Sequence, residues 1–346
     1  MLAFGTQTIN ARGHLEVGGC DCVELAREYG TPLYVLDEAL IRENCRRYRR
    51  VFEAAYPPGV NVAYAGKALL TQAICKLMAQ EGMWLDVASG GELHTALVAD
   101  FPPEHIYFHG NYKSAAELEM ALDGGVGEIV IDSLAEIEAL EALAGGRAQT
   151  AAVAIRVAPG IKVHTHTYIQ TGQVDSKFGL GVEGSLAMRG LRRAAGSGHL
   201  DLRGVHCHIG SQIFSLESYE RTVEIMLDLM AEAQAEGIRL RELNLGGGLG
   251  IRHTHEDAPV PLGHFANTIC TALSRGLEER KLDPPTLVLE PGRSIVGEAG
   301  LTLYTIGVVK EIPGVRTYVS VDGGLSDNPR PGLYQAEYEA VVANKA

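Results

Sequence analysis

A short apolar run followed by a helical stretch recurs along most of this chain, and this alternation constrains the fold more than any other feature. The first four β-type runs begin at residues 61, 83, 105 and 128, so their starts are 22, 22 and 23 residues apart. Such spacing holds one strand, one helix and two tight loops, which is typical of βα units in a parallel sheet. The eight runs are residues 61–65, 83–88, 105–109, 128–132, 151–157, 202–208, 241–245 and 285–289.

Eight such runs are the number of strands in a (β/α)8 barrel, and residues 61–293 approach the ~250 residues of that fold. We therefore predict an α/β protein with a TIM-like (β/α)8 barrel over residues 33–291. An open doubly wound sheet is the alternative, but its glycine-rich turn would follow the first strand, whereas here it follows the seventh. Helices are expected over residues 70–81, 92–99 and 115–122.

The chain outside the barrel has a different pattern. Residues 301–309 and 315–321 are rich in β-forming side chains without an intervening helix, and residues 1–17 look extended. We predict that both termini, 1–32 and 292–346, form a second, β-rich domain, with a helix over residues 334–342.

Charge and cysteine usage narrow the partners and the compartment. The 30 basic and 43 acidic residues give a net charge of −13, which argues against nucleic acid or an anionic membrane as a standing partner. No apolar stretch approaches the ~18 residues of a membrane span, and no signal-peptide pattern opens the chain. The six cysteines are scattered, unlike a disulfide framework. We expect a cytoplasmic protein with reduced thiols.

Lys67 follows the first strand run, at the kind of strand end where barrel enzymes carry their active sites. Its neighbours are small or apolar, and no acidic residue occurs between Pro57 and Gln80. We therefore expect a partly desolvated amine without an acidic partner, which can attack a carbonyl and form a Schiff base. A surface lysine that caps a strand is the alternative.

Two further strand ends carry groups suited to a charged ligand. Gly246-Gly247-Gly248 follow the seventh run, and successive glycines can turn their N–H groups toward one anion, such as a phosphate. Glu290 directly follows the eighth run, where its charge needs a partner such as a pyridinium nitrogen. The alternatives are a structural glycine turn and a Glu290–Arg293 ion pair that closes the barrel.

The sixth run ends in His206-Cys207-His208 and leads to Ser211. Strand alternation places His206 and His208 on one side, so a metal site that also uses His164 and His166 is one interpretation. A histidine ring can instead stack on a flat cofactor, with Ser211 donating to a phosphate. A metal site needs carboxylates, and Glu290 is better explained as a cofactor partner.

Together these groups match the needs of pyridoxal 5'-phosphate. Lys67 offers an amine for its aldehyde, the glycine turn offers donors for its phosphate, and a histidine offers a ring to pack on. Glu290 can keep the pyridine nitrogen protonated, and the protonated ring is an electron sink. We therefore predict this cofactor.

Over essentially its whole length the sequence resembles the barrel-type, fold-type III pyridoxal-phosphate-dependent amino-acid decarboxylases, especially those that act on diaminopimelate. The segments that carry the resemblance are residues 64–68, 86–93, 110–114, 176–179, 206–212, 290–293, 322–324 and 330–334. The resemblance implies decarboxylation of meso-2,6-diaminopimelate to L-lysine, the last step of lysine biosynthesis, in a homodimer with shared active sites.

The resemblance also implies roles for individual residues. Lys67 forms the covalent link to the cofactor, His208 stacks on its ring and Glu290 pairs with the pyridine nitrogen, as the catalytic residues. The remaining cofactor-binding residues are Asp86, Arg156, Ser211, Gly246, Gly247, Gly248, Gly292 and Arg293. Arg293, Arg330 and Tyr334 hold the distal amino-acid head of the substrate, where guanidinium groups suit a carboxylate.

The sequence departs from the family pattern in one respect. The family's proton-donating cysteine stands in a Cys-Glu-Ser-Gly-Asp segment contributed across the dimer interface, followed by a substrate-binding tyrosine, and this chain contains neither. We expect a C-terminally truncated decarboxylase with an incomplete β domain. The rival functions are a decarboxylase of ornithine, arginine or carboxynorspermidine, a non-catalytic pyridoxal-phosphate-binding protein, and a metal-dependent barrel hydrolase.

Overall fold

The computed structural model describes residues 5–161 and 177–346, and the chain divides into two compact units. The barrel unit comprises Cys45–Gly250 and Pro259–Ser294. The terminal unit comprises Met1–Asn44, Ile251–Ala258 and Ile295–Ala346. These units are defined by internal contacts, and the domain limits at residues 33 and 291 stay a prediction.

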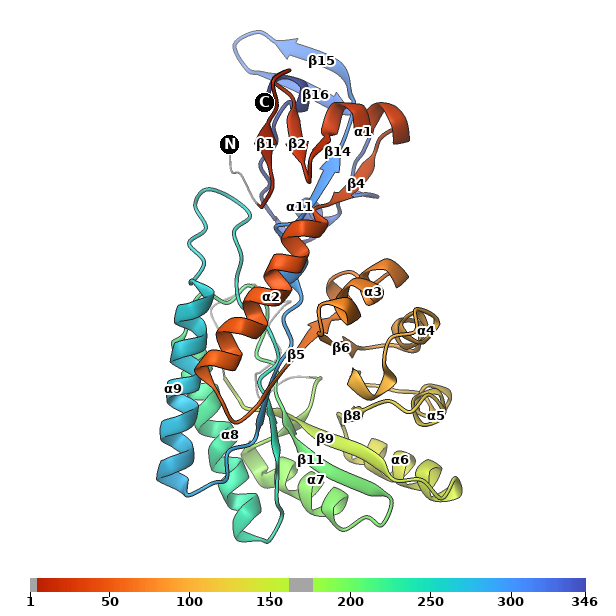
Figure 1. Cartoon of the computed structure of the whole chain (residues 1–346), viewed down its shortest axis with the longest axis vertical. Coiled ribbons are helices and arrows are strands. Elements are labelled where there is room, and N and C mark those ends of the chain that lie inside the picture. Colours follow the sequence, from red (N-terminus) through yellow and green to blue (C-terminus); the bar gives the residue numbers. More distant parts are fainter. Residues whose placement is uncertain (1–4, 162–176) are drawn as a thin grey trace. The chain divides into compact units, whose positions relative to one another are not determined.

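The barrel unit is a closed, parallel, eight-stranded barrel surrounded by helices (Figure 1), which confirms the predicted fold class. Each strand pairs with the next along the chain, and the last strand, β13, pairs with the first, β5. The barrel strands are β5 (Val60–Ala65), β6 (Trp84–Val87), β7 (Ile106–Phe108), β8 (Glu128–Ile131), β9 (Ala151–Ala158), β11 (Leu200–His206), β12 (Glu242–Asn244) and β13 (Thr286–Leu289). A short β10 (Leu180–Gly181) adds to β9 outside this ring.

Helices follow the barrel strands in turn (Figure 1), and the last part of α2 belongs to the same unit. They are α2 (Glu38–Ala55), α3 (Gln72–Gln80), α4 (Gly90–Val98), α5 (Ala115–Asp123), α6 (Leu134–Gly146), α7 (Leu186–Ala195), α8 (Glu217–Ala235), α9 (Leu262–Arg280) and the short α10 (Arg293–Val296). Short 3-10 turns lie at η1 (Gly66–Ala68), η2 (Pro103–His105) and η4 (Glu183–Ser185).

Hydroxyl N-caps fix where α3 to α6 begin. The side chains of Thr71, Ser89, Ser114 and Ser133 each accept a backbone N–H of the first turn of their helix. At α5, Glu117 completes a capping box, and its Oε1 also accepts the N–H of Gly90 at 2.8 Å. This contact ties the start of α5 to the start of α4, at the carboxyl ends of the strands.

The barrel interior is filled by apolar side chains and by two buried carboxyl groups. Ala63, Tyr107 and Val288 form one buried cluster. Glu128 begins β8 and Glu242 begins β12, so both lie at the amino-terminal end of the barrel, where the charge of Glu242 raises the pKa of Glu128. Tyr107 Oη also donates to Glu242 Oε2 at 3.3 Å.

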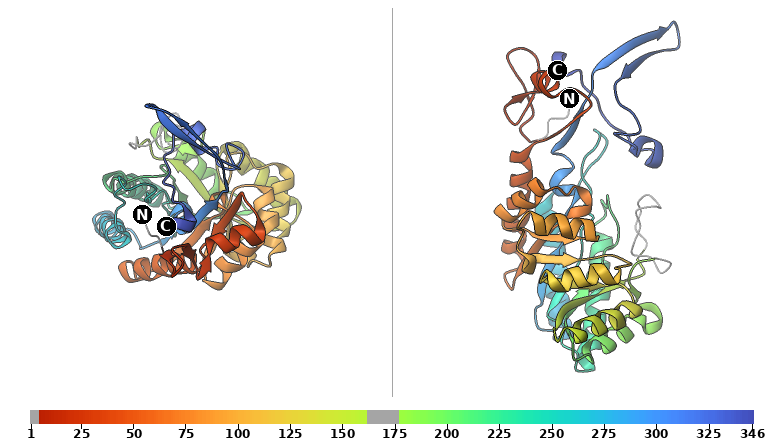
Figure 2. Two further views of the ribbon diagram at one scale, coloured as in Figure 1. Left: turned by 90° about the horizontal axis from the view of Figure 1, so that it is seen from above. Right: turned by 90° about the vertical axis from the view of Figure 1, so that its right-hand side faces the viewer.

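The terminal unit joins both ends of the chain, as predicted. In it β4 (Leu33–Leu36) pairs antiparallel with β14 (Gly300–Leu303), and β1 (Thr8–Ile9), β2 (Leu15–Val17) and β3 (Cys20–Asp21) form a second sheet beside α1 (Cys22–Tyr29). Its small core contains Leu15, Val17, Cys22 and Leu303. The hairpin of β15 (Ile306–Ile312) and β16 (Arg316–Val321) is an exposed two-stranded ribbon (Figure 2).

The helix predicted over residues 334–342 is wrong. The structure has α11 at Arg330–Tyr334, and the chain then continues without regular structure to the 3-10 turn η5 (Ala343–Lys345). Gln335 adopts a left-handed conformation, with φ 53° and ψ 32°, which ends the helix. The sequence pattern of residues 334–342 gives no indication of this left-handed residue.

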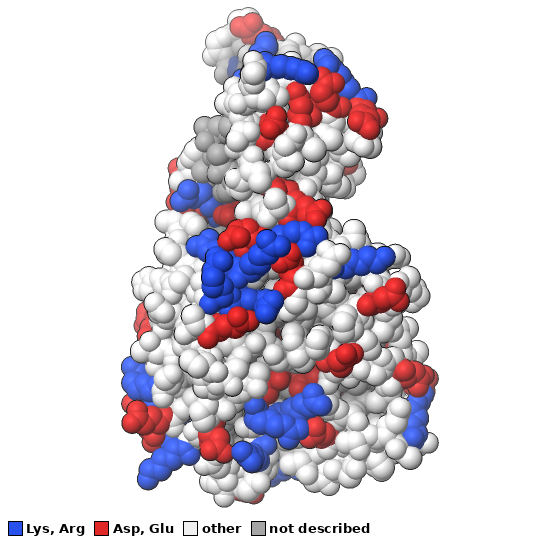
Figure 3. Space-filling view, viewed as in Figure 1, with Lys and Arg blue, Asp and Glu red and all other residues white. Residues whose placement is uncertain are grey.

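Charged side chains form ion pairs on the surface, and the cysteines are free, as expected. Basic side chains gather over α2 among acidic ones (Figure 3), and Arg42 pairs with Glu38, Arg46 with Glu81. All six cysteines are free, and five are buried. Among the described residues, no helix combines the length and apolar character needed to cross a membrane.

Candidate active site

Lys67 lies in the 3-10 turn directly after β5, at the carboxyl end of the barrel. The expectation of a desolvated amine without an acidic partner is wrong. The Lys67 side chain is 55% exposed, and its Nζ lies 3.4 Å from Asp86 Oδ2. Asp86 is distant in sequence, but β5 and β6 are paired so that Ala65 lies beside Asp86, which brings the carboxylate to the lysine.

His208 follows β11 and shares the electrostatic environment of Lys67. Burial lowers the pKa of His208 well below its usual value, and the nearby positive charges of Lys67 and Arg156 lower it further. The imidazole is therefore neutral at pH 7. Arg156, on β9, packs over the Phe178 ring at 4.4 Å, with its Nε 3.7 Å from Asp132 Oδ1.

Ser211 and Arg293 form the side of the site that was predicted to hold a phosphate. Arg293 Nε donates to Ser211 Oγ at 3.3 Å. Near them, Gly247 is packed so closely that a Cβ there would lie 2.1 Å from the backbone oxygen of Glu290. Within residues 5–161 and 177–346, the N–H groups of Gly247 and Gly248 donate to no backbone oxygen. They therefore remain available to an anion.

Gly292 completes this side of the site beside the lysine turn. A Cβ on Gly292 would lie 3.0 Å from Ala65 Cβ and 3.2 Å from Ala68 Cβ. The backbone N–H of Ala65 also donates to Pro291 O at 3.1 Å. Glycine therefore permits the segment after β13 to lie directly against the turn that carries Lys67.

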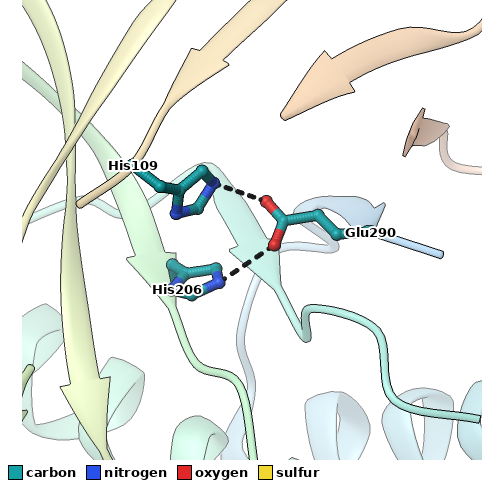
Figure 4. Close-up of side chains that lie close together, drawn as sticks. All are labelled: His109, His206 and Glu290. Atoms are coloured by element: carbon teal, nitrogen blue, oxygen red, sulfur yellow. Dashed lines mark hydrogen bonds and ion pairs between the residues drawn. The ribbon is translucent and has the colours of Figure 1, made fainter. Parts of the chain in front are cut away.

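Glu290 follows β13 and is the most heavily hydrogen-bonded carboxylate of the site (Figure 4). His109 Nε2 lies 2.8 Å from Glu290 Oε1, and His206 Nε2 lies 3.1 Å from Oε2. Asn244 Nδ2 donates to Oε1 at 2.6 Å. His109 and Asn244 were missed by the sequence analysis, although each stands at or just after the end of a strand run, the signal that marked the other residues.

The alternative metal site, built on two histidine pairs, is described by the structure only in part. His164 and His166 lie outside the described residues. His206 instead joins His109 and Glu290, with ligand atoms within 4.8 Å of one another. Because the Asn244 amide points a hydrogen-bond donor at the same carboxylate, this cluster does not favour a cation.

A buried ion pair supports the loops next to these residues. Lys113 Nζ lies 2.6 Å from Glu136 Oε1 and donates to the backbone oxygens of Gly110 and Val130 at 2.9 and 2.8 Å. All three N–H groups of the ammonium are thereby used. Lys113 thus ties the loop after His109 to the end of β8.

Arg330 and Tyr334, predicted to bind substrate, occupy the two ends of α11 in the terminal unit. The Nε of Arg330 is buried and has no hydrogen-bond partner in the part of the chain that the structure describes. Tyr334 is 40% exposed.

Comparison with known proteins identifies the family. The family model of the pyridoxal-dependent decarboxylase, pyridoxal binding domain, matches residues 38–297. The chain belongs to this family.

Relatives of this decarboxylase are similar over almost its whole length. Diaminopimelate decarboxylase of Bacillus methanolicus is 47% identical, in an alignment that covers 100% of this chain and 80% of the relative. The enzyme of the same name from Bacillus subtilis (strain 168) is also 47% identical, covering 100% and 79%. The crystal structure of diaminopimelate decarboxylase from M. jannaschii in co-complex with L-lysine is 36% identical with a TM-score of 0.90, covering 96% and 77%.

This decarboxylase is accordingly a carboxy-lyase, and its cofactor is pyridoxal 5'-phosphate. The described residues fit that cofactor. An amine, a neutral histidine, a buried carboxylate and two unused backbone donors lie at the carboxyl ends of barrel strands. They are the four kinds of group that its aldehyde, ring face, ring nitrogen and phosphate require.

Proposed function

We propose that this decarboxylase converts meso-2,6-diaminopimelate to L-lysine and carbon dioxide, the last step of lysine biosynthesis. The observation that carries the proposal is the 47% identity to two enzymes named diaminopimelate decarboxylase, across the whole of this chain. The L-lysine in the M. jannaschii complex has the chemistry of the expected product.

We assign the chemical roles to residues at the barrel mouth. Lys67 would bind the cofactor covalently, His208 would pack on its ring and Glu290 would accept the N–H of its ring nitrogen. The bound cofactor supplies an electron sink for the carbanion left when carbon dioxide departs. Asp86 would orient the lysine amine through the 3.4 Å contact, and Arg156 would keep the surroundings of His208 positive.

The phosphate would be bound by Ser211, Arg293 and the turn of Gly246, Gly247 and Gly248, with Gly292 providing room. The contact between Ser211 and Arg293 and the unused glycine N–H groups support this assignment. A guanidinium and backbone donors suit a phosphate because each gives charge-assisted hydrogen bonds.

Arg293, Arg330 and Tyr334 would select the substrate by binding its distal amino-acid head. The Nε of Arg330 is buried without a hydrogen-bond partner among the described residues, which supports an anionic ligand at this residue. A substrate that lacks the distal carboxylate would leave such donors unmatched, which discriminates strongly.

The test compares substrates directly. Purified protein is incubated with meso-diaminopimelate, ornithine, arginine or carboxynorspermidine, and carbon dioxide and amine products are measured. We expect turnover of diaminopimelate alone, and Arg330→Leu should reduce its selectivity over ornithine. Preferential turnover of ornithine, arginine or carboxynorspermidine would assign a different substrate, and cofactor binding without turnover of any would favour a binding protein.

We further propose a homodimer with shared active sites. The β15–β16 hairpin supports this because it exposes an apolar surface, on which Val308 is 66%, Val309 60% and Val319 52% exposed. Apolar surface of this kind is typical of an interface between chains. Sedimentation velocity should give twice the mass of the 37.1 kDa chain, and Val308→Glu should shift the protein toward monomer. A monomer at micromolar concentration would contradict the proposal.

A further inference from the structure

Glu290 is held by the side chains of His109 and His206 (Figure 4) and by that of Asn244, which stand at the ends of three other strands of the barrel. His109 is the first residue after β7, His206 ends β11 and Asn244 ends β12. All four side chains are almost fully buried, with 5% or less of each residue exposed. The carboxylate therefore has fixed protein partners rather than water.

The direction of these hydrogen bonds can be read from the amide. Asn244 Oδ1 accepts the backbone N–H of Gly246 at 2.9 Å, so its Nδ2 faces Glu290. Glu290 Oε1 is therefore an acceptor. Burial would raise the pKa of Glu290, but the interactions with His109 and His206 outweigh it and hold this pKa well below the usual value.

His206 is neutral and can donate through Nε2. Burial lowers its pKa to about 3. Its Nδ1 is buried and makes no hydrogen bond with the described residues, as expected if the ring proton is on Nε2 and faces Glu290. His109 Nε2 makes the shorter contact, on the oxygen that also accepts from Asn244.

We propose that His109 is a positioning residue for the cofactor: with His206, it holds Glu290 ionised and in one orientation, so that the carboxylate can keep the cofactor's ring nitrogen protonated. This inference rests on the proposed role of Glu290. A carboxylate has about four acceptor sites, so three N–H donors leave room for one more. Other charged groups that interact with this cluster are Asp86, 3.8 Å from His109 Nε2, and Arg156.

The consequence of removing one histidine donor differs from a loss of packing. A buried carboxylate with fewer donors takes up a proton more readily, and a neutral Glu290 would no longer stabilise a protonated ring nitrogen. Glutamine at residue 109 can still donate an N–H, whereas leucine and methionine cannot. Comparing His109→Gln with His109→Leu and His109→Met therefore separates the loss of the hydrogen-bond donor from the loss of side-chain packing.

The experiment uses holoenzyme reconstituted with pyridoxal phosphate labelled with ¹⁵N in the ring, and it reads the ring-nitrogen resonance. Borohydride reduction, followed by mass spectrometry, confirms that the cofactor is attached at Lys67 in every variant. We expect wild type and His109→Gln to give the signal of a protonated nitrogen. His109→Leu and His109→Met should move the signal toward an unprotonated nitrogen, while His94→Leu, at an exposed histidine of α4, should not.

Two outcomes would overturn the inference, and they are distinguishable. A wild-type signal in His109→Leu or His109→Met, together with a shifted signal in Glu290→Gln, would remove the role of His109 alone. An unshifted signal in Glu290→Gln would instead overturn the pairing of Glu290 with the ring, and the proposal with it. Methionine preserves the length of the side chain, so it remains informative if the leucine variant does not fold.

Discussion

Lys67 and Asp86 stand beside one another at the ends of adjacent strands, with Nζ 3.4 Å from Oδ2. The Asp86 carboxylate is 2% exposed and the Lys67 side chain is 55% exposed. A buried acid therefore contacts an amine that is accessible to solvent. This arrangement keeps the ammonium at one place while leaving it open to a carbonyl.

Replacing this lysine should abolish covalent attachment of the cofactor. After borohydride treatment, intact-mass spectrometry of Lys67→Ala should show no added cofactor, because the amine that forms the bond is gone. Lys76→Ala, at an exposed position on α3, is the matched control and should be labelled fully. Labelled Lys67→Ala would show that another lysine carries the cofactor.

Glu290→Gln should retain much of the cofactor but slow decarboxylation by roughly 10²–10³-fold, the typical effect of losing one electrostatic partner of the transition state. KM should change little, since the lost interaction matters mainly after substrate binds. Glu278→Gln, at an exposed position on α9, should leave kcat unchanged. Steady-state measurement of carbon dioxide release decides the matter, and near-normal turnover would reduce Glu290 to a structural role.

The paired carboxyl groups of Glu128 and Glu242 should make stability depend on pH. Burial raises the pKa of both, and in Glu128 the neighbouring Glu242 raises it further. Above a pH of about 4.3 the unfolded chain releases these protons while the folded chain keeps them, so the stabilising effect falls as pH rises through the raised pKa values.

Glu128→Gln removes one of these ionisations without changing the shape of the side chain. Its free energy of unfolding should therefore rise relative to wild type as pH increases from 5 to 8, by up to about 1.4 kcal/mol per pH unit for one proton. Urea unfolding at several pH values measures the difference. A difference that stays constant with pH would show that Glu128 is already ionised in the folded protein.

Lys113→Met should be strongly destabilising because it leaves Glu136 buried without its counter-ion. Breaking such a pair typically costs about 3–5 kcal/mol. The second substitution in Lys113→Met, Glu136→Gln should restore part of the loss, and thermal unfolding of the two proteins tests this. Arg239→Met breaks the exposed pair with Asp283 and should have no measurable effect. Additive losses at 113 and 136 would contradict the pairing.

Local pattern was sufficient for the barrel and for the position of residues that stand at their own strand end. Lys67, His208 and Glu290 all stand at or just after the end of a strand run in the sequence. The structure places them at the carboxyl ends of β5, β11 and β13. Contacts between strands were not predictable in this way. The pairing of Lys67 with Asp86, and of Glu290 with His109, depends on strand register and on closure of the barrel.

The sequence was least informative where a single backbone conformation decides the structure. The helix expected over residues 334–342 failed because Gln335 turns the chain into a left-handed conformation, which non-glycine residues adopt rarely. His109 was missed for a different reason: it carries the strand-end signal of the other site residues, but this signal does not show that its side chain is a hydrogen-bond partner of Glu290.

The pairing of β13 with β5 also sets the order in which this site can be assembled. Leu287 lies beside Val60, so the contact joins parts of the chain that are far apart in sequence. We expect this contact to form late, because closing the long intervening loop costs conformational entropy. Lys67 follows one of these strands and Glu290 follows the other. Until β13 pairs with β5, Lys67 and Glu290 are not brought together and the site is incomplete. Amide hydrogens of β5 and β13 should accordingly exchange faster in apoprotein than in holoenzyme, whereas those of β8 and β9 should change little.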